Sequence, residues 1–455
     1  MLKNFRRSYW LFTGFVSKHK GKILLTALAT AVGITILPQL AQKIPTGKPT
    51  QRIGRVGQYS LEKLPPDIEK RVSQGLTGIG EDGTASPSLA MNWNITDDGK
   101  RYVFTLNPDI QWHDGQTIQA AHIIYDLQDV ETNIVSSNMV EFKLKEPFAP
   151  FPTALASPLF RKTTRISRLL KRQKSELLGT GEFQIKTVIR RGQYILQLDL
   201  ESLTQKLRYK FYPSETSAMT AYKLGEVDYL EEITNPKVLK DWQNTHTTEN
   251  VHTDRYVAVF FNTQDALLAD KNFRQALTYA IPNKDPGGHR ALGPLNPNSW
   301  AYNPQVKPYK TDLKRAKELI TKIKAEDKEF NPTIRLDTTL AYLDTAEKIK
   351  QAWADIGVNS EVRVITYPPS EYQALLIAHQ IPADPDQYTL WHSTQKDSNI
   401  TKLINHKIDK LLEDGRRTMD QEQREQIYFD FQRFLLEESP AAFLFHPSTY
   451  TISRK

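Results

Sequence analysis

SLAMNWNITDDGKRYVFTLNPDIQWHDGQTIQAAHIIYDL, residues 88–127, contains the clearest local signals of this 455-residue chain. Residues 101–106 alternate apolar and polar side chains after an Asp-Asp-Gly turn at 97–99, which predicts a strand. Residues 117–127 place apolar side chains at helical spacing behind a Thr cap, which predicts a helix. The Trp-His-Asp-Gly sequence at 112–115 joins the two as a loop. A strand, a loop and a helix in succession indicate a mixed α/β structure.

The same alternation of strand and helix signals continues to the end of the chain. Strands are predicted at 139–145, 183–198 (a hairpin), 227–230, 256–261, 358–365 and 441–445. Helices are predicted at 214–224, 270–280, 311–323, 344–356, 405–414 and 420–438. Strands and helices that interleave throughout favour the α/β class. The length favours two or three domains over one.

Composition excludes several classes of protein. Apolar residues make up 39% of the chain and aromatic residues 10%, which excludes a disordered chain, a fibrous repeat and a polytopic membrane protein. The formal charge is +8, but residues 1–22 hold six basic groups and no acid, which leaves +2 for the rest. A nucleic-acid partner is therefore not indicated. The absence of cysteine excludes thiol nucleophiles, disulfides, cysteine-zinc sites and lipoprotein attachment.

The N-terminus has the pattern of a membrane-targeting segment. Residues 23–41, ILLTALATAVGITILPQLA, contain no charge and follow the basic residues 1–22. This length and polarity predict a single-pass signal anchor with 1–22 in the cytoplasm and the remainder outside the cell. A cleaved signal peptide cut after Ala41 is the second interpretation, although Gln39 occupies a position that favours small residues. A buried helix is the third, and residues 42–52 have the composition of a linker.

Motifs of known catalytic chemistry are absent from the sequence. We find no GxSxG elbow, P-loop, dinucleotide-binding GxGxxG or HExxH helix. The ten histidines are scattered, and no spacing predicts a metal site. A glycosidase carboxylate pair cannot be located among so many acids. The basic run at 161–174 is compatible with a solvated helix face or with contact to anionic lipid or an acidic partner.

Aromatic residues gather in one part of the chain that is rich in Pro and Asp. Tyr367, Tyr372, Tyr388 and Trp391 with His392 fall within 26 residues. Aromatic rings on irregular backbone suit a ligand cleft, because they give contact area at small entropic cost. Packing of the same rings beneath a loop is the equally open alternative.

The stretch at 88–127 strongly resembles the signature of extracellular solute-binding protein family 5, the oligopeptide-, dipeptide- and nickel-binding receptors of ABC importers. Departures include Ala120-Ala121-His122, where the family usually has Ala followed by acidic residues, and Glu182 in place of a proline. Seven further segments match the family in order, and the resemblance covers about residues 53–450. These segments are 145–156, 179–185, 218–230, 261–281, 307–320, 346–362 and the region around 405–446.

The resemblance implies an α/β fold of the type II periplasmic binding protein kind, with two hinged lobes and a reduced N-terminal subdomain. One transmembrane helix would precede them. Between Asp129 and Val140 the chain is shorter than in the family, which implies that the subdomain is trimmed. The implied divisions are 1–22 cytoplasmic tail, 23–41 anchor, 42–52 linker, 53–60 with 175–250 lobe I, 61–174 subdomain, 251–435 lobe II and 436–455 return to lobe I.

The function implied by the resemblance is capture of a peptide-like ligand between the lobes and its delivery, unaltered, to ABC permease subunits. The expected protein is a monomer without catalytic residues, cofactor, metal or nucleic-acid partner. Two alternatives from other classes are an extracellular hydrolase and an anchored binding or regulatory scaffold that has lost its ligand.

The implied ligand-binding residues lie in the loop at 379–393, HQIPADPDQYTLWHS. Peptide receptors of the family carry an Asp there that pairs with the ligand α-amino group. One alignment places that Asp at Ile381, and the other places it at Asp384. We expect Asp384 to pair with a ligand cation, and Tyr388, Trp391 and His392 to flank the ligand.

Overall fold

The computed structural model describes residues 13–14, 17–22, 48–166, 173–285 and 287–454. The chain divides into a unit Met1–Thr50 and a unit Gln51–Lys455, and the fold described below belongs to the second. No helix within the described ranges has the length and apolar character needed to span a bilayer. The predicted anchor at 23–41 lies outside the described residues.

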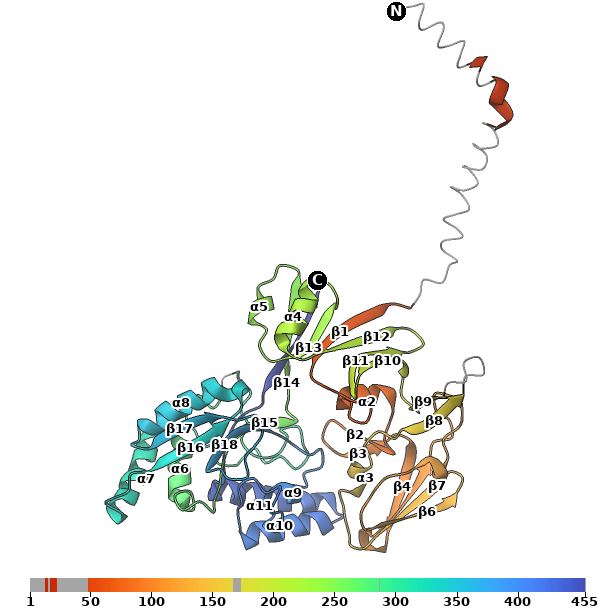
Figure 1. Cartoon of the computed structure of the whole chain (residues 1–455). Helices are drawn as coiled ribbons and strands as arrows, with labels where there is room; N and C mark the ends of the chain where they lie inside the picture. The colour runs from red at the N-terminus through yellow and green to blue at the C-terminus, as the bar shows by residue number, and fades with distance from the viewer. Residues whose placement is uncertain (1–12, 15–16, 23–47, 167–172, 286, 455) are drawn as a thin grey trace, which may run out of the picture. The chain divides into compact units, whose positions relative to one another are not determined.

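Lobe I, as we name it, is built on a seven-stranded sheet in the order β10-β11-β12-β1-β13-β20-β14 (Figure 1). β1 pairs in parallel with β13, whereas β20 runs antiparallel to both β13 and β14. The strands are β1 (Thr50–Val56), β10 (Gln184–Arg191), β11 (Tyr194–Glu201), β12 (Lys206–Tyr212), β13 (Tyr229–Ile233), β14 (Thr245–Val251) and β20 (Ser448–Arg454). Helices α2 (Pro66–Val72), α4 (Glu215–Lys223) and α5 (Lys237–Lys240) accompany them.

The subdomain comprises Thr77–Leu178 and follows α2 in the chain. Its main sheet has the order β4-β5-β7-β6, and its buried face carries the aromatic side chains of Tyr102, Phe104 and Phe142. The strands are β2 (Thr77–Ile79), β3 (Ala85–Pro87), β4 (Ala90–Thr96), β5 (Arg101–Leu106), β6 (Val130–Ser136), β7 (Met139–Leu144), β8 (Arg161–Ile166) and β9 (Gln173–Leu178). Short helices η1 (Asp97–Gly99), η2 (Ala120–His122) and α3 (Phe151–Ala154) connect them.

Two sequence predictions for the subdomain are wrong. The helix expected at 117–127 is only the single turn η2, because the backbone is extended at Gln119 and Ile123 on either side of it, and Ile118 and Ile123 are both buried in the core. The helix face considered for the basic run at 161–174 is not found at its described ends, which belong to the antiparallel strands β8 and β9, and residues 167–172 lie outside the described residues. The sequence at 161–166 contains three β-branched residues, a composition that favours a strand over a helix.

Lobe II is a five-stranded sheet, order β17-β16-β18-β15-β19, with helices on both faces (Figure 1). Its strands are β15 (Arg255–Phe261), β16 (Thr333–Thr338), β17 (Asn359–Val364), β18 (Ala374–Gln380) and β19 (Ala441–Phe445). Its helices are α6 (Lys271–Ala280), α7 (Leu313–Glu326), η3 (Leu340–Tyr342), α8 (Leu343–Ala354), α9 (Tyr388–Trp391), α10 (His406–Arg417) and α11 (Gln421–Glu438). The strand predicted at 256–261 and the helices predicted from 270 onward are confirmed in type and approximate position.

The central strand β15 shows why this sheet is covered on both faces. Val257, Val259 and Phe261 pack with α6, α7 and α8, whereas Tyr256 and Phe260 pack with α9, α10 and α11. Successive side chains of a strand point to opposite faces, so a continuous apolar strand requires a core on each side.

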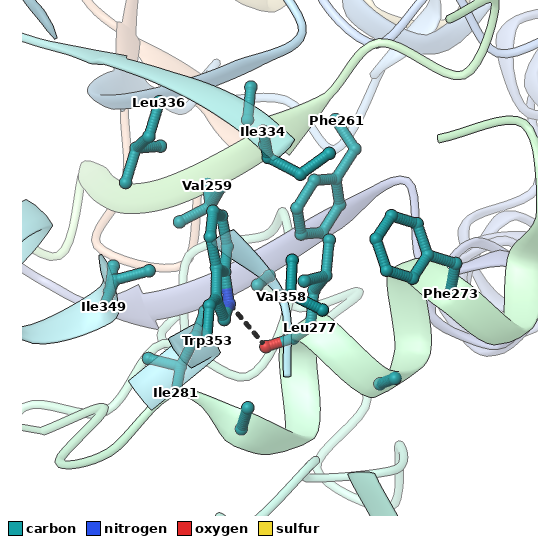
Figure 2. Close-up of a cluster of buried hydrophobic side chains, with 14 of the residues drawn as sticks. Val259, Phe261, Phe273, Leu277, Ile281, Ile334, Leu336, Ile349, Trp353 and Val358 are labelled. Carbon is teal, nitrogen blue, oxygen red and sulfur yellow. Dashed lines mark hydrogen bonds between the residues drawn. The ribbon is translucent and has the colours of Figure 1, made fainter. Parts of the chain in front are cut away.

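Trp353 of α8 lies at the centre of the first of these two cores (Figure 2). Its side chain is fully buried, and its Nε1 donates a hydrogen bond to the Leu277 carbonyl oxygen at 3.1 Å. The indole therefore fills the space between α8 and α6 and leaves no buried polar atom of its own unsatisfied.

Two short crossings connect the lobes. The chain leaves β14 of lobe I and enters β15 of lobe II through residues 252–254. It returns from β19 to β20 through residues 446–447. Because both crossings are short, they hold the ends of β14 and β20 of lobe I close to the ends of β15 and β19 of lobe II.

Candidate functional site

A cavity of about 620 Å³ lies between lobe I and lobe II. This volume falls within the roughly 300–1,000 Å³ that is typical of small-molecule sites. Its walls come from β1, α2, β13 and β20 of lobe I, from β15 and β18 of lobe II, and from the 252–254 crossing. The lining residues are Arg55, Pro66, Asp67, Lys70, Arg71, Glu231, Glu232, His252, Asp254, Arg255, Ala378, His379, Gln380 and Thr451.

The cavity lining contains four acidic and four Lys or Arg side chains. Arg55 pairs with Asp67 at 2.6 Å between Nη1 and Oδ2, and the same nitrogen lies 3.9 Å from a Glu231 oxygen. Arg255 lies 3.5 Å from Asp254. With histidine counted as neutral, the formal net charge of the lining is therefore zero. The wall nevertheless carries both negative and positive side chains.

An irregularity in β13 places two consecutive glutamates on the cavity. The pairing of β13 with β20 shifts register between Leu230 and Ile233, and Glu232 has a left-handed φ of 58°. A bulge of this kind re-aims side chains that would otherwise alternate between the two faces of a strand. Glu231 and Glu232 both line the cavity as a result. Burial raises the pKa of Glu231 above its usual value, and the nearby Arg55 partly opposes that rise.

Helix α2 contributes the opposite charge. Asp67, Lys70 and Arg71 share one face of the helix at i, i+3 and i+4, while Ile68 and Val72 are buried in the core of lobe I. Asp67 forms the ion pair with Arg55 of β1 that is described above. The structure gives no ion pair for Lys70 or Arg71 in the part of the chain that it describes. Their charges are therefore available to a ligand.

The two crossings are hydrogen-bonded to each other at the edge of the cavity. The His252 backbone N–H donates to the Pro447 carbonyl oxygen at 2.9 Å, and the His252 Nε2 lies 3.5 Å from a Glu232 oxygen. On the return crossing, His446 Nδ1 lies 2.8 Å from the Arg255 carbonyl oxygen. Burial lowers the pKa of His446, which favours its neutral form at physiological pH. The crossings are thus tied together by neutral hydrogen bonds.

The part of the lobe II wall that β18 contributes is uncharged, whereas β15 contributes the charged Arg255. Ala378, His379 and Gln380 are the last three residues of β18. The His379 ring packs against Tyr256 and Phe260, with centroids 5.9 and 6.1 Å apart. Burial lowers the pKa of His379, so this wall presents a neutral imidazole and an amide to the cavity.

Asp384, the residue predicted to bind a ligand cation, is paired inside the protein. Its Oδ1 accepts a hydrogen bond from Arg424 Nη2 at 2.8 Å and another from the Asp386 backbone N–H at 2.9 Å. Asp384 and Arg424 are only 7% and 6% exposed, so solvent screens the pair little. Asp384 is not a lining residue of the interlobe cavity, and its role in ligand binding stays a prediction.

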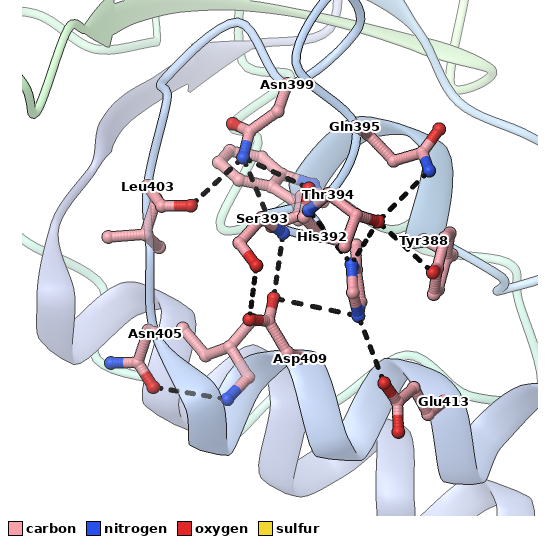
Figure 3. A network of polar contacts seen from close by, with 12 residues as sticks. Tyr388, His392, Ser393, Thr394, Gln395, Asn399, Leu403, Asn405, Asp409 and Glu413 are labelled. Carbon is pink, nitrogen blue, oxygen red and sulfur yellow. Dashed lines mark hydrogen bonds and ion pairs between the residues drawn. The ribbon is translucent and has the colours of Figure 1, made fainter.

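Tyr388, Trp391 and His392 lie on α9 and the residue after it, and none of them lines the interlobe cavity. Figure 3 shows Tyr388 and His392 in their network of polar contacts. The Tyr388 ring stacks on the His392 ring at 4.0 Å, and the Arg416 guanidinium lies 3.9 Å from the Tyr388 centroid. His392 Nε2 is 3.4 Å from a Glu413 oxygen, and Trp391 is buried in the lobe II core. These contacts explain how the segment folds, and the ligand-binding role of the three residues stays a prediction.

The subdomain also contacts lobe II. The Ala149 backbone N–H donates to the Arg416 carbonyl oxygen at 2.7 Å, and Arg417 pairs with Glu146 at 2.8 Å. A second, smaller cavity of about 210 Å³ lies at this contact, and Tyr388 is one of its lining residues. Lobe II therefore contacts lobe I at the crossings and the subdomain at α10.

The sequence interpretation missed the residues of the interlobe cavity. Two charged pairs offered a weak signal, because Glu231-Glu232 directly follows the predicted strand at 227–230 and Asp254-Arg255 directly precedes the one at 256–261. Charges that flank short apolar strands often lie at the end of a sheet, where clefts form. The bulge that turns both glutamates into the same cavity has no comparable signature in the sequence.

Comparison with known families matches this chain over most of its length. The model of the bacterial extracellular solute-binding proteins, family 5 middle region, matches residues 84–400. The oligopeptide-binding protein AppA of Bacillus subtilis is 23% identical and covers 90% of this chain and 89% of its own length. The dipeptide-binding protein of Escherichia coli is 24% identical, with coverage of 95% and 93%.

Solved structures share the fold at similar coverage. NikZ from Campylobacter jejuni, in complex with Ni(L-His), superposes with a TM-score of 0.71 at 22% identity over 89% of this chain and 94% of its own. AppA from Bacillus subtilis, in complex with a nonapeptide, gives a TM-score of 0.68 at 20% identity, with coverage of 90% and 95%. The expected α/β fold of the periplasmic binding protein kind is confirmed by these structures.

Proposed function

We propose, from the premise that this chain belongs to the bacterial extracellular solute-binding proteins of family 5, that it captures peptide-like ligands in the interlobe cavity. The chain is a solute-binding protein, as its relatives are, and the peptide ligand is our inference. The observation that carries this inference is the cavity lining, with four acidic and four basic side chains in about 620 Å³. A small peptide is a zwitterion with many hydrogen-bonding groups, and such a wall is complementary to it.

Closure of the lobes would couple capture to delivery. In the described chain two crossings connect lobe I to lobe II, and the cavity takes residues from both lobes. A ligand that contacts both walls stabilises the closed state, because only that state offers both sets of contacts. We propose that ABC permease subunits recognise this closed form of a monomeric receptor.

We further propose that residues 23–41 hold the receptor at the cell surface. The uncharged sequence and the six preceding basic residues support an uncleaved anchor. Fractionation of the source cells provides the check, with the mass of the intact chain as readout. A membrane-bound protein that retains its first residues is expected, whereas a soluble chain that begins near residue 42 would favour the cleaved signal.

Ligand-induced stabilisation tests the peptide assignment. A pool of tripeptides with free ends is expected to raise Tm in a concentration-dependent way, because ligand that binds only the folded state adds to its stability. The gain is about 2.7 kcal/mol at one hundred times Kd. Differential scanning fluorimetry of the full chain in detergent measures the shift in Tm.

A nickel-histidine chelate and a pool of oligosaccharides serve as comparison ligands in the same experiment. Stabilisation by the chelate or the sugars, with none by peptides, would contradict a peptide ligand and leave the solute-binding assignment in place. If none of the three pools raises Tm, the result would favour a binding scaffold that has lost its ligand.

A further inference from the structure

The loop of lobe II offers no free carboxylate for a ligand ammonium group. One candidate position, Asp384, is buried and hydrogen-bonded to Arg424. The other, Ile381, is apolar and 5% exposed. The residues of this loop region that reach the cavity are His379 and Gln380, and neither supplies a carboxylate. An ammonium group in the cavity must therefore find its counter-charge elsewhere.

Lobe I and the crossing provide that counter-charge. Glu232 lies on the β13 bulge and lines the cavity, and the Nε2 atom of His252 lies 3.5 Å from its carboxylate. Asp254 and Glu231 line the same cavity, but each also lies within 4 Å of an arginine. Of these three carboxylates, Glu232 is the one with no arginine or lysine within ion-pair distance in the described residues. It is therefore best placed to accept an ammonium group.

A second observation, on the cavity wall itself, points to a ligand that carries acceptor groups. Arg55 lines the cavity with a side chain that is only 9% exposed, and its Nε has no hydrogen-bond partner among the described residues. A buried donor without an acceptor costs free energy, so such donors are rare unless a ligand or water completes them. Lys70 and Arg71 on the adjacent helix supply further positive charge without an ion-pair partner in that part of the chain.

We infer that this receptor reads both ends of a zwitterionic peptide with lobe I, its ammonium group with Glu232 and its carboxylate with Arg71, and not with the loop at 379–393. The inference rests on the proposed function. The neutral wall of His379 and Gln380 then contacts the uncharged middle of the ligand. Ligands with both ends free are the class selected, and a blocked end lowers affinity because it removes the charge that would pair with Glu232 or Arg71.

Three tripeptide pools of the same composition test this assignment: one with free ends, one N-acetylated and one C-amidated. The wild-type full chain is expected to bind the free pool at least about tenfold more tightly than either blocked pool, by isothermal titration calorimetry. In Glu232→Gln the preference against the acetylated pool should fall below about threefold while the preference against the amidated pool persists. Arg71→Gln should show the reverse pattern.

Matched variants in lobe I control for general effects. Glu249→Gln on β14 and Arg191→Gln on β10 lie outside the cavity lining and should keep both preferences. Glu232→Asn, which tolerates a left-handed φ, replaces Glu232→Gln if that variant does not fold. Unchanged end-group preferences in the Glu232 and Arg71 variants would overturn the inference. Failure of every peptide pool to bind the wild type would instead overturn the proposed function.

Discussion

Replacing Asp384 by alanine is expected to lower the free energy of unfolding by about 3–5 kcal/mol, because it leaves the Arg424 guanidinium buried without its carboxylate. Arg424 is 6% exposed, and its Nε already donates to the Gly415 carbonyl oxygen at 2.9 Å. Water therefore cannot solvate the guanidinium group in place of the lost carboxylate. Urea denaturation followed by circular dichroism measures the loss. Such a loss would identify Asp384 as a structural residue of lobe II.

The matched control is an exposed ion pair of the same residue types. Asp430 and Arg433 on α11 lie 2.9 Å apart, with side chains 52% and 60% exposed, and Asp430→Ala should change the stability by at most about 1 kcal/mol. The opposite outcome for Asp384→Ala is equally informative. A variant with wild-type stability that no longer binds free-ended peptides would establish Asp384 as the ligand's counter-charge, as the sequence predicted.

Truncation of Trp353 to alanine is expected to lower the free energy of unfolding by about 3–5 kcal/mol. The indole is fully buried between α8 and α6, so its removal leaves a cavity and frees the Leu277 carbonyl oxygen (Figure 2). Chemical denaturation again gives the value. Tyr367→Ala, at a position that is 81% exposed, should stay within about 0.5 kcal/mol of the wild type. Equal effects of the two substitutions would show that the core of lobe II is not assembled as described.

The sequence predicts the architecture well where patterns are long and periodic. The apolar run at 256–261 and the amphipathic helix at 420–438 correspond to β15 and α11 within a few residues, because burial on one or two faces imposes a regular spacing. Residues 117–127 mislead for the same reason. Their apolar side chains have helical spacing, but Ile118 and Ile123 are buried from positions outside the single turn η2, and tertiary packing overrides the local signal.

The site is harder to predict than the fold because it is assembled from separate strand ends. The side chains that line the interlobe cavity, among them Arg71, Glu232, Asp254 and Gln380, come from segments that are far apart in the sequence. The aromatic residues of the loop at 379–393 predicted a ligand site, yet the ring of Trp391 is part of the lobe II core. Aromatic content alone does not distinguish a ligand wall from the packing beneath a loop.

Native mass spectrometry of the receptor purified from its own cells, with and without a blocked cavity, tests the central claim most directly. Ala378 lies exposed on the cavity wall, and Ala378→Trp should fill part of the space that a ligand needs. Ala354→Trp, at an exposed position of α8 outside the cavity lining, is the matched control. We predict that the wild type and Ala354→Trp carry peptide-sized ligands that Ala378→Trp lacks. Retention of the same ligands by Ala378→Trp would contradict capture in the interlobe cavity.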